Sequence, residues 1–322
     1  MYSVALLCLT SSVFLLSEQH CLSRRGPLTL ANWANLRSYT RRVRYIYNLR
    51  WLPHLRKYLE LLSNPPTTEP LFPNLRYLHC RYDEMTMPLL NLPLPTLTYL
   101  DVAFQNTKLF QASFKSFPKF SPNIRELSFH IENKSGRIEP SYICHWQNLR
   151  SVTAHSFPLD INDLVHLSRM PALIKLDFLL RHTFPDFESP LSFSNLQRLA
   201  LNSNSLHPIS WLLPHIRLPA ITDFQVWIAD CPSNAELASF LMGVLTSNAG
   251  HAVEKLRLDQ GFFHEDHVRS QALLLNLKDL RPCMSFSNLR EFWLNTECTV
   301  CLSDIDLLTL AHPHGPRWKI FE

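Results

Sequence analysis

The chain has 322 residues, of which 46% are hydrophobic and 18% are charged, with a formal net charge of +4. This composition can bury a sizeable core, and the length suits two ordinary domains or one long solenoid. The six glycines leave no G-x-G-x-x-G, G-x-x-x-x-G-K or G-x-S-x-G pattern, which argues against standard Rossmann dehydrogenases, P-loop NTPases, kinases and α/β-hydrolases. Leucine occurs 58 times, which points to a periodic architecture.

The first apolar segment runs from Val4 to Leu16. Its 13 residues are too few to span a bilayer, and no other stretch is long enough, so we expect no membrane span. The segment resembles the apolar part of a signal peptide, but Met1-Tyr2-Ser3 has no positive side chain and no small-residue cleavage site follows. Eight scattered cysteines without a framework spacing favour a cytoplasmic or nuclear protein, with secretion as the alternative.

A basic stretch follows, with nine Lys or Arg residues and no Asp or Glu between Arg24 and Lys57. Its central cluster, which could grip phosphates or an acidic partner, comprises Arg37, Arg41, Arg42 and Arg44. In the favoured interpretation the cluster is the solvated face of an end element whose apolar face holds Trp33, Leu36, Tyr39 and Val43. We expect no nucleic-acid partner, because no basic–aromatic alternation continues beyond residue 57.

A short apolar motif, L-x-x-L-x-L with conservative replacements, recurs along the rest of the chain. Its nine instances begin at Leu75, Leu97, Ile124, Leu149, Leu173, Leu196, Ile221, Val253 and Leu289, and Val43 begins a plausible tenth at the front. Successive starts lie 22 to 36 residues apart, and the middle spacings match leucine-rich repeats. In each motif the last two apolar residues would enter the core from a strand, and stacked units would share that core.

Turn and cap residues separate these motifs. Several are introduced by a turn pair, namely Pro73-Asn74, Pro122-Asn123, Gln147-Asn148, Ser194-Asn195 and Ser287-Asn288. Helices are predicted at 161–167 after Asp160, at 235–245 after Ser233 or Asn234, at 266–280, and at 304–310 after Ser303. Prolines make irregular loops the expectation at 110–122 and 184–190, and residues 316–322 lie where a further strand would begin.

These features predict an α/β fold, an irregular leucine-rich-repeat solenoid. A curved parallel sheet would form the concave side, and helices and loops the convex side. Residues 27–322 would form about ten repeat units, and residues 1–26 would be a separate apolar segment.

Several segments resemble fungal F-box-like leucine-rich-repeat proteins over roughly residues 27–322. They are Pro27-Leu28-Thr29-Leu30-Ala31-Asn32-Trp33, Tyr39-Thr40-Arg41-Arg42-Val43-Arg44, the spaced Asn-Leu-Arg units and Leu302-Ser303-Asp304-Ile305-Asp306-Leu307-Leu308. The resemblance implies a substrate receptor of a cullin ubiquitin ligase, whose F-box docks on a Skp-type adaptor while the repeats hold a target.

The chain departs from this pattern in two places. No Leu-Pro-x-Glu opening precedes the repeats, so Val4 to Phe14 could at most be the remnant of the last F-box helix. A Skp-type adaptor is therefore expected only if an F-box is present. The asparagine that usually ends the motif occurs only at Asn204, so a continuous asparagine ladder is not expected.

Two clusters of potential metal ligands or nucleophiles have ordinary interpretations. Cys298-Thr299-Val300-Cys301 has His312 and His314 downstream, but this spacing fits neither a zinc finger nor a thioredoxin-like site. His264-Glu265-Asp266-His267 is not H-E-x-x-H and suits a helix start better. We therefore expect no catalytic residues, no metal and no cofactor.

The concave face is the expected binding surface, because the residues between and after the last two apolar positions of each motif project away from the core. The candidates are Tyr47, His79, Arg81, Asp101, His130, His155, Asp177, Gln225, Trp227, Arg257, Asp259 and Trp293. Trp, Tyr and Arg dominate protein interfaces. His130 and His155, on consecutive strands, would form a pH-sensitive patch if exposed.

The preferred function is therefore a non-enzymatic protein-binding repeat protein that holds a protein target, as an F-box-type receptor or its truncated relative. A stand-alone repeat protein without a ligase role and a secreted repeat protein remain the alternatives.

Overall fold

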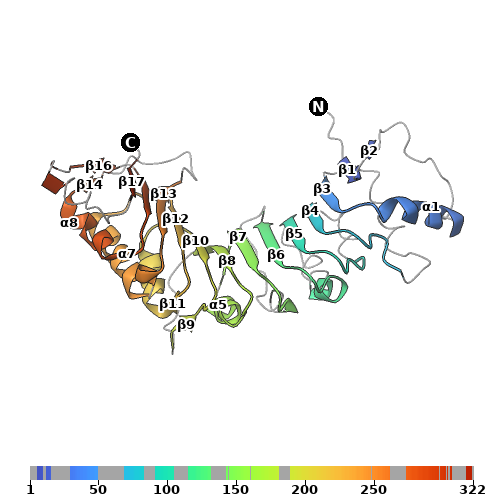
Figure 1. The fold of residues 1–322 in the computed structure, drawn as a ribbon, viewed down its shortest axis with the longest axis horizontal. Coiled ribbons are helices and arrows are strands. Elements are labelled where there is room, and N and C mark those ends of the chain that lie inside the picture. Colours follow the sequence, from blue (N-terminus) through green and yellow to red (C-terminus); the bar gives the residue numbers. More distant parts are fainter. Residues whose placement is uncertain are drawn as a thin grey trace. The chain divides into compact units, whose positions relative to one another are not determined.

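The computed structural model describes residues 6–9, 12–15, 30–49, 69–82, 91–104, 115–131, 143, 145–159, 161–180, 189–247, 249–261, 273–296, 298–301, 303, 305–306 and 317–320. The chain divides into two compact units, Met1–Leu149 and Arg150–Glu322. Both units are built on parallel strands (Figure 1).

The first unit contains four parallel strands among its described residues, paired in chain order. They are β3 (Tyr45–Leu49), β4 (Tyr77–Tyr82), β5 (Tyr99–Phe104) and β6 (Glu126–Ile131). Helix α1 (Leu30–Thr40) precedes β3. It buries Trp33 and is followed by the buried Val43, whereas Tyr39, predicted on the same apolar face, is exposed.

One expectation for the first unit is wrong, and its N-terminal segment contains strands. Leu6–Leu9 (β1) and Ser12–Leu15 (β2) pair as antiparallel strands. Residues 115–120, expected in an irregular loop, are helical. These residues include Pro118, and they bury Phe117.

The main sheet of the second unit contains seven parallel strands among the described residues. In spatial order they are β7 (Ser151–Pro158), β8 (Lys175–Leu180), β10 (Arg198–Ser203), β12 (Asp223–Ile228), β13 (Lys255–Gln260), β15 (Glu291–Asn295) and β17 (Arg317–Ile320). Two small parallel pairs join β9 (Leu191–Ser192) to β11 (Ile216–Arg217) and β14 (Leu273–Leu275) to β16 (Cys298–Val300). The strand expected near residue 316 is confirmed as β17, which pairs with β15.

Helices of the second unit lie along one side of its strands (Figure 1). They are α5 (Ile161–Ser168), α6 (His207–Leu212), η2 (Leu213–His215), α7 (Asn234–Thr246), η3 (Ala249–His251), α8 (Leu277–Leu280) and η4 (Arg281–Ser285). We call the side of the strands that faces away from the buried motif residues, in either unit, the open face.

The helix predictions for 161–167 and 235–245 are confirmed by α5 and α7. The side chain of Ser233 accepts a hydrogen bond from the backbone N–H of Glu236, and the Glu236 carboxylate accepts one from the N–H of Ser233. Ser303 and Asp306 make the same reciprocal cap, although most of the predicted helix 304–310 lies outside the described residues.

The helix predicted over 266–280 is wrong at 273–275 and confirmed at 277–280. Leu273–Leu275 is a strand that pairs with β16, and only Leu277–Leu280 is helical. The Asn276 side chain caps this short helix by accepting a hydrogen bond from the N–H of Lys278. The apolar run that suggested a long helix is therefore used for strand pairing.

The core follows the predicted repeat. All 27 apolar residues of the nine motifs are buried, none more than 5% exposed. The strand register places equivalent positions side by side, so that Leu176 pairs with Leu199, Leu199 with Phe224 and Phe224 with Leu256. Adjacent strands lie about 4.8 Å apart, and each repeat therefore buries its apolar residues against the next. The fold is an α/β leucine-rich-repeat solenoid, as predicted.

The turn residue just before several motifs links one repeat to the previous one. The side-chain amide of Asn74 donates to the carbonyl of Arg41 at 2.7 Å, and that of Asn195 donates to the carbonyl of Pro171 at 2.8 Å. The same bond is made by Asn123 to Pro95, by Asn288 to His251 and, through a hydroxyl, by Thr96 to Pro73. These bonds satisfy turn carbonyls that the pairing of the strands leaves without a donor.

Candidate binding surface on the open face

The open face carries three side-chain positions from each strand, because successive residues alternate between core and solvent. Sequence analysis identified two of these positions in each motif. One lies between the last two apolar residues, as His79 does, and the other follows the last apolar residue, as Arg81 does. The structure adds the residue just before the second apolar residue of the motif, and this residue lies on the same face, as Tyr77 does in β4 and Lys255 in β13. Simple two-residue alternation could have revealed this third row.

In the first unit, two histidines flank one carboxylate. Asp101 lies on β5, and its Oδ2 is 2.8 Å from Nδ1 of His79 on β4. Its Oδ1 lies 3.4 Å from Nε2 of His130 on β6, and that nitrogen is 3.2 Å from the Ser128 hydroxyl. Asp101 is only 9% exposed, so the carboxylate charge is largely enclosed by its neighbours.

A stack of tyrosines lies next to this cluster, and sequence analysis missed all but one of its members. The rings of Tyr77 and Tyr99 are parallel within 11° at 4.1 Å, and Tyr47 stacks on Tyr77 at 4.6 Å. Tyr45 packs against Tyr77 with tilted rings. The signal was Tyr at one position in three successive repeats. Burial, together with the hydrogen bond to the Tyr47 hydroxyl, raises the pKa of Tyr77 well above the usual range of a phenol, so this hydroxyl stays protonated.

In the second unit, a similar cluster surrounds Asp177 on β8. Its Oδ1 lies 3.0 Å from Nδ1 of His155 on β7 and accepts a hydrogen bond of 3.1 Å from the amide of Asn202 on β10. Trp227 on β12 meets the His155 ring edge to face at 6.5 Å. Asp177 is 4% exposed, whereas the side chain of His155 is 44% exposed. The buried carboxylate therefore positions a histidine that reaches solvent, while Asn202 is itself buried at 7% exposure.

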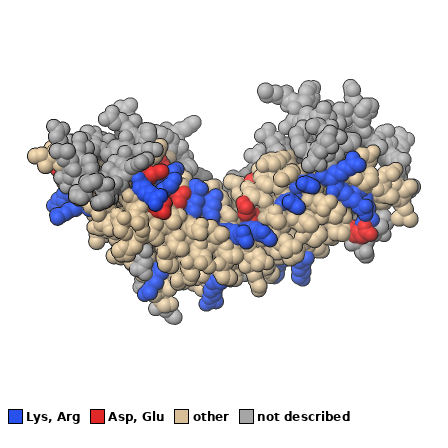
Figure 2. Space-filling view, viewed as in Figure 1, with Lys and Arg blue, Asp and Glu red and all other residues tan. Residues whose placement is uncertain are grey.

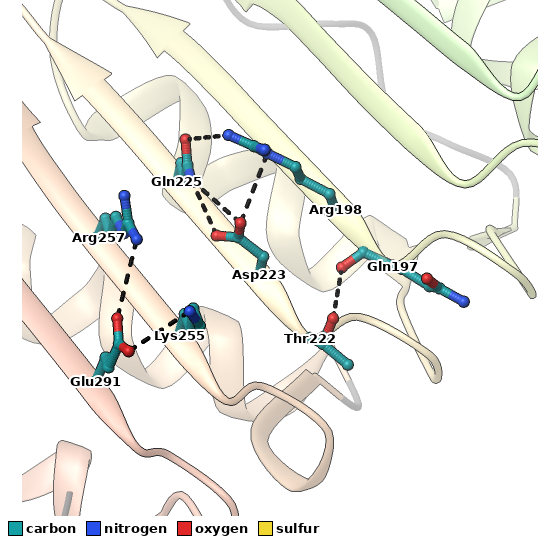
Figure 3. A network of polar contacts seen from close by, with 8 residues as sticks. All are labelled: Gln197, Arg198, Thr222, Asp223, Gln225, Lys255, Arg257 and Glu291. Atoms are coloured by element: carbon teal, nitrogen blue, oxygen red, sulfur yellow. Dashed lines mark hydrogen bonds and ion pairs between the residues drawn. The ribbon is translucent and has the colours of Figure 1, made fainter. Parts of the chain in front are cut away.

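Two groups of polar contacts cover the neighbouring strands β10, β12, β13 and β15, with three cations against two carboxylates (Figure 3). Arg198 donates to the Gln225 side-chain oxygen at 3.1 Å and lies 3.6 Å from Asp223. The Gln225 amide in turn donates to Asp223 at 3.0 Å.

A second group lies on β13 and β15, where Glu291 lies between two cations (Figure 3). It is 3.4 Å from Lys255 and 3.8 Å from Arg257, and the Arg257 guanidinium lies 5.9 Å from the Trp293 ring centre. These contacts hold Arg257 and Trp293 in place while both stay partly exposed.

The predicted site residues thus divide into two groups. Asp101, Asp177 and Gln225 are buried and support their neighbours. The partly or fully exposed candidates are Tyr47, His79, His130, His155, Trp227, Arg257, Asp259 and Trp293, and the side chain of Arg81 lies outside the described residues. His130 and His155, expected to form one patch, each lie against a different carboxylate, Asp101 or Asp177.

The other sequence candidates are described only in small part. Cys301 is exposed, whereas His264, His267, His312 and His314 lie outside the described residues. Within the part of the chain that the structure describes, no group of three or more His, Cys, Asp or Glu residues is arranged to hold a metal ion. In that same part, every helix is too short or too polar to cross a membrane.

Comparisons with known proteins give the fold context. No family model matches the chain, and no curated protein matches it. Among solved structures, it is similar to an internalin (inlF) from Listeria monocytogenes, with 14% sequence identity over 78% of this chain and 77% of that one and a TM-score of 0.30. The assignment to the leucine-rich-repeat fold therefore depends on the strand register and buried motifs described above.

Proposed function

We propose that the chain is a non-enzymatic protein-binding repeat protein whose open face holds a protein target. The observation that carries this proposal is the set of aromatic and arginine side chains held half-exposed on the strands, with Trp293 beside Arg257 as the clearest pair. Such side chains dominate binding hot spots, and fixing them before a partner arrives reduces the entropy lost on binding.

Site-specific photo-crosslinking in the native cells tests this proposal. A benzophenone side chain at Asn295, an exposed position on β15, should form protein adducts. The matched control is Met242, which is 49% exposed on α7. Trp227→Ala and Trp293→Ala should reduce the Asn295 adducts several-fold without lowering the melting temperature. Adducts at Met242 with none at Asn295 would contradict the proposal.

The finer assignment that we propose is a substrate receptor of the F-box type, acting by proximity: the repeats would present a bound target to a ubiquitin-charged enzyme. It is supported by the resemblance of residues 27–33 and of the repeated Asn-Leu-Arg units. Direct titration of the full chain with a Skp-type adaptor tests it. Absence of binding would remove the ligase role and leave the stand-alone repeat protein, with cytoplasm or nucleus as the proposed location.

A further inference from the structure

The two units carry opposite net charges. Residues 1–149 contain 17 Lys and Arg against nine Asp and Glu, a net charge of +8. Residues 150–322 contain 14 Lys and Arg against 18 Asp and Glu, a net charge of −4. In Figure 2, Lys and Arg side chains gather over the region of α1, β3 and β4. The overall charge of +4 conceals this difference between the units. The net charge of +8 makes the first unit favour anionic partners.

Three arginines occupy one repeat position at the start of the strands. Arg44, Arg76 and Arg125 directly precede β3, β4 and β6, with Thr98 at this position before β5. Backbone hydrogen bonds join these positions from one strand to the next. The N–H of Arg76 donates to the carbonyl of Arg44, that of Thr98 to the carbonyl of Arg76, and that of Arg125 to the carbonyl of Thr98. All three arginines are exposed, and among the described residues none has an ion-pair partner.

The tyrosine stack follows these charges in the chain, since Tyr45 comes directly after Arg44 and Tyr77 directly after Arg76. Tyr47 and Tyr99 cover the two faces of the Tyr77 ring, at 4.6 and 4.1 Å. The Tyr77 hydroxyl is hydrogen-bonded to the hydroxyls of Tyr47 and Tyr99, so the stack leaves mainly ring edges for a ligand. The edge of an aromatic ring is its positive part, so the stack also favours an anionic partner.

The carboxylates of this face oppose an anion only weakly. Asp101 is enclosed between His79 and His130. Glu126, at the start of β6, is the exposed acidic residue among the described residues on this face. It lies next to Arg125 in the chain and in register with Tyr99, and it therefore marks one end of the anion-favouring surface.

We propose that the first unit binds an acidic polypeptide segment whose carboxylates contact Arg44, Arg76 and Arg125 at the starts of the strands, where this row borders the tyrosines that begin β3 and β4 on the open face. The inference rests on the proposed protein-binding function and names the chemistry of the partner. A single-stranded nucleic acid is disfavoured because nucleic-acid sites use free aromatic faces to stack bases, and both faces of Tyr77 are covered.

Fluorescence anisotropy with the full chain and a labelled oligoglutamate peptide tests the proposal. Binding should weaken as salt is added, and Arg44→Glu and Arg76→Glu should each weaken it about five- to tenfold, since each replaces an attraction by a repulsion. Glu126→Gln should strengthen it several-fold. The matched control is Arg290→Glu, at the same repeat position in the second unit, where Arg290 pairs with Glu254 at 3.7 Å.

The remaining outcomes separate the alternatives. Equal losses in Arg290→Glu and Arg76→Glu would show general charge attraction and overturn the proposed site. Tighter binding of oligothymidine than of oligoglutamate, lost in the same variants, would replace the peptide by a nucleic acid. If oligoglutamate does not bind but protein adducts form at Asn295, this inference alone is overturned. If both experiments fail, the proposed function is overturned as well. Melting curves of every variant verify the fold.

Discussion

The indole Nε1 of Trp146 donates a hydrogen bond of 2.9 Å to the backbone carbonyl of Ser121, 25 residues earlier in the chain. Trp146 is fully buried and meets the ring of Phe117 edge to face at 6.3 Å. This side chain lies outside the repeat motif, yet it joins the helical turn at 115–120 to the segment that enters the next repeat.

Trp146→Ala should destabilise the first unit by about 3–5 kcal/mol, because it removes a large buried ring and leaves a cavity. Trp146→Phe should cost about 1–3 kcal/mol, mainly because the Ser121 carbonyl loses its donor. Urea unfolding followed by circular dichroism measures both. If both variants lost the same small free energy of unfolding, neither the buried ring nor its hydrogen bond would contribute as assigned.

Leu199→Asp should abolish cooperative melting of the second unit. Leu199 is 2% exposed and pairs in register with Leu176 and Phe224, so the substitution buries an unpaired charge in a core shared by three strands. Gln197→Asp is the control, since it adds the same charge at an exposed position two residues away. If thermal melting of Leu199→Asp matched that of the control, the register would be wrong.

Gly243 should tolerate Ala but not Leu. A Cβ atom at this position would lie 3.1 Å from Leu213 in η2, so α7 and η2 pack with little spare room. In Gly243→Ala, the gain in helix propensity, about 1 kcal/mol, should roughly offset the close contact. Gly243→Leu should destabilise the second unit by about 1–3 kcal/mol through overpacking. Differential scanning calorimetry can rank the variants, and a more stable Leu variant would refute this close packing.

Asn195→Ala should cost about 0.5–1.5 kcal/mol, because the Pro171 carbonyl loses the side-chain amide that links two repeats. Ser194→Ala, at the exposed neighbouring position, should change the free energy of unfolding by less. Chemical denaturation of the pair gives the difference directly. Similar values for both would mean that the turn asparagines do not link repeats energetically.

The cysteines should differ in reactivity towards iodoacetamide. Burial raises the pKa of the Cys283 thiol far above its ordinary value, and both Cys80 and Cys283 are 0% exposed. Cys301 is exposed. At mildly alkaline pH, peptide mapping should find Cys301 modified in the native protein and the two buried thiols modified only in denaturant. Rapid labelling of native Cys283 would show that the core around η4 opens.

Much of the fold could be predicted because burial in a repeat follows a local period. The two-residue alternation around Leu199 and Leu201 predicts which side chains face the core, and recurrence at a spacing near 25 residues predicts that equivalent strands stack. The caps at Ser233 and Ser303 were also predictable, since capping involves residues only three apart. The candidate surface residues follow from the same alternation.

The sequence alone could not predict which side chains of neighbouring strands contact one another. Asp101 and Asp177 read as solvent-facing, but side chains from neighbouring strands enclose them, at distances that depend on register. The apolar run at 273–275 satisfies a helical pattern equally well, and only pairing with β16 makes it a strand. The tyrosine stack exists because parallel strands about 4.8 Å apart bring residues more than 20 positions apart into ring contact. Local spacing therefore predicts which residues are buried, while tertiary packing decides which polar groups meet on the open face.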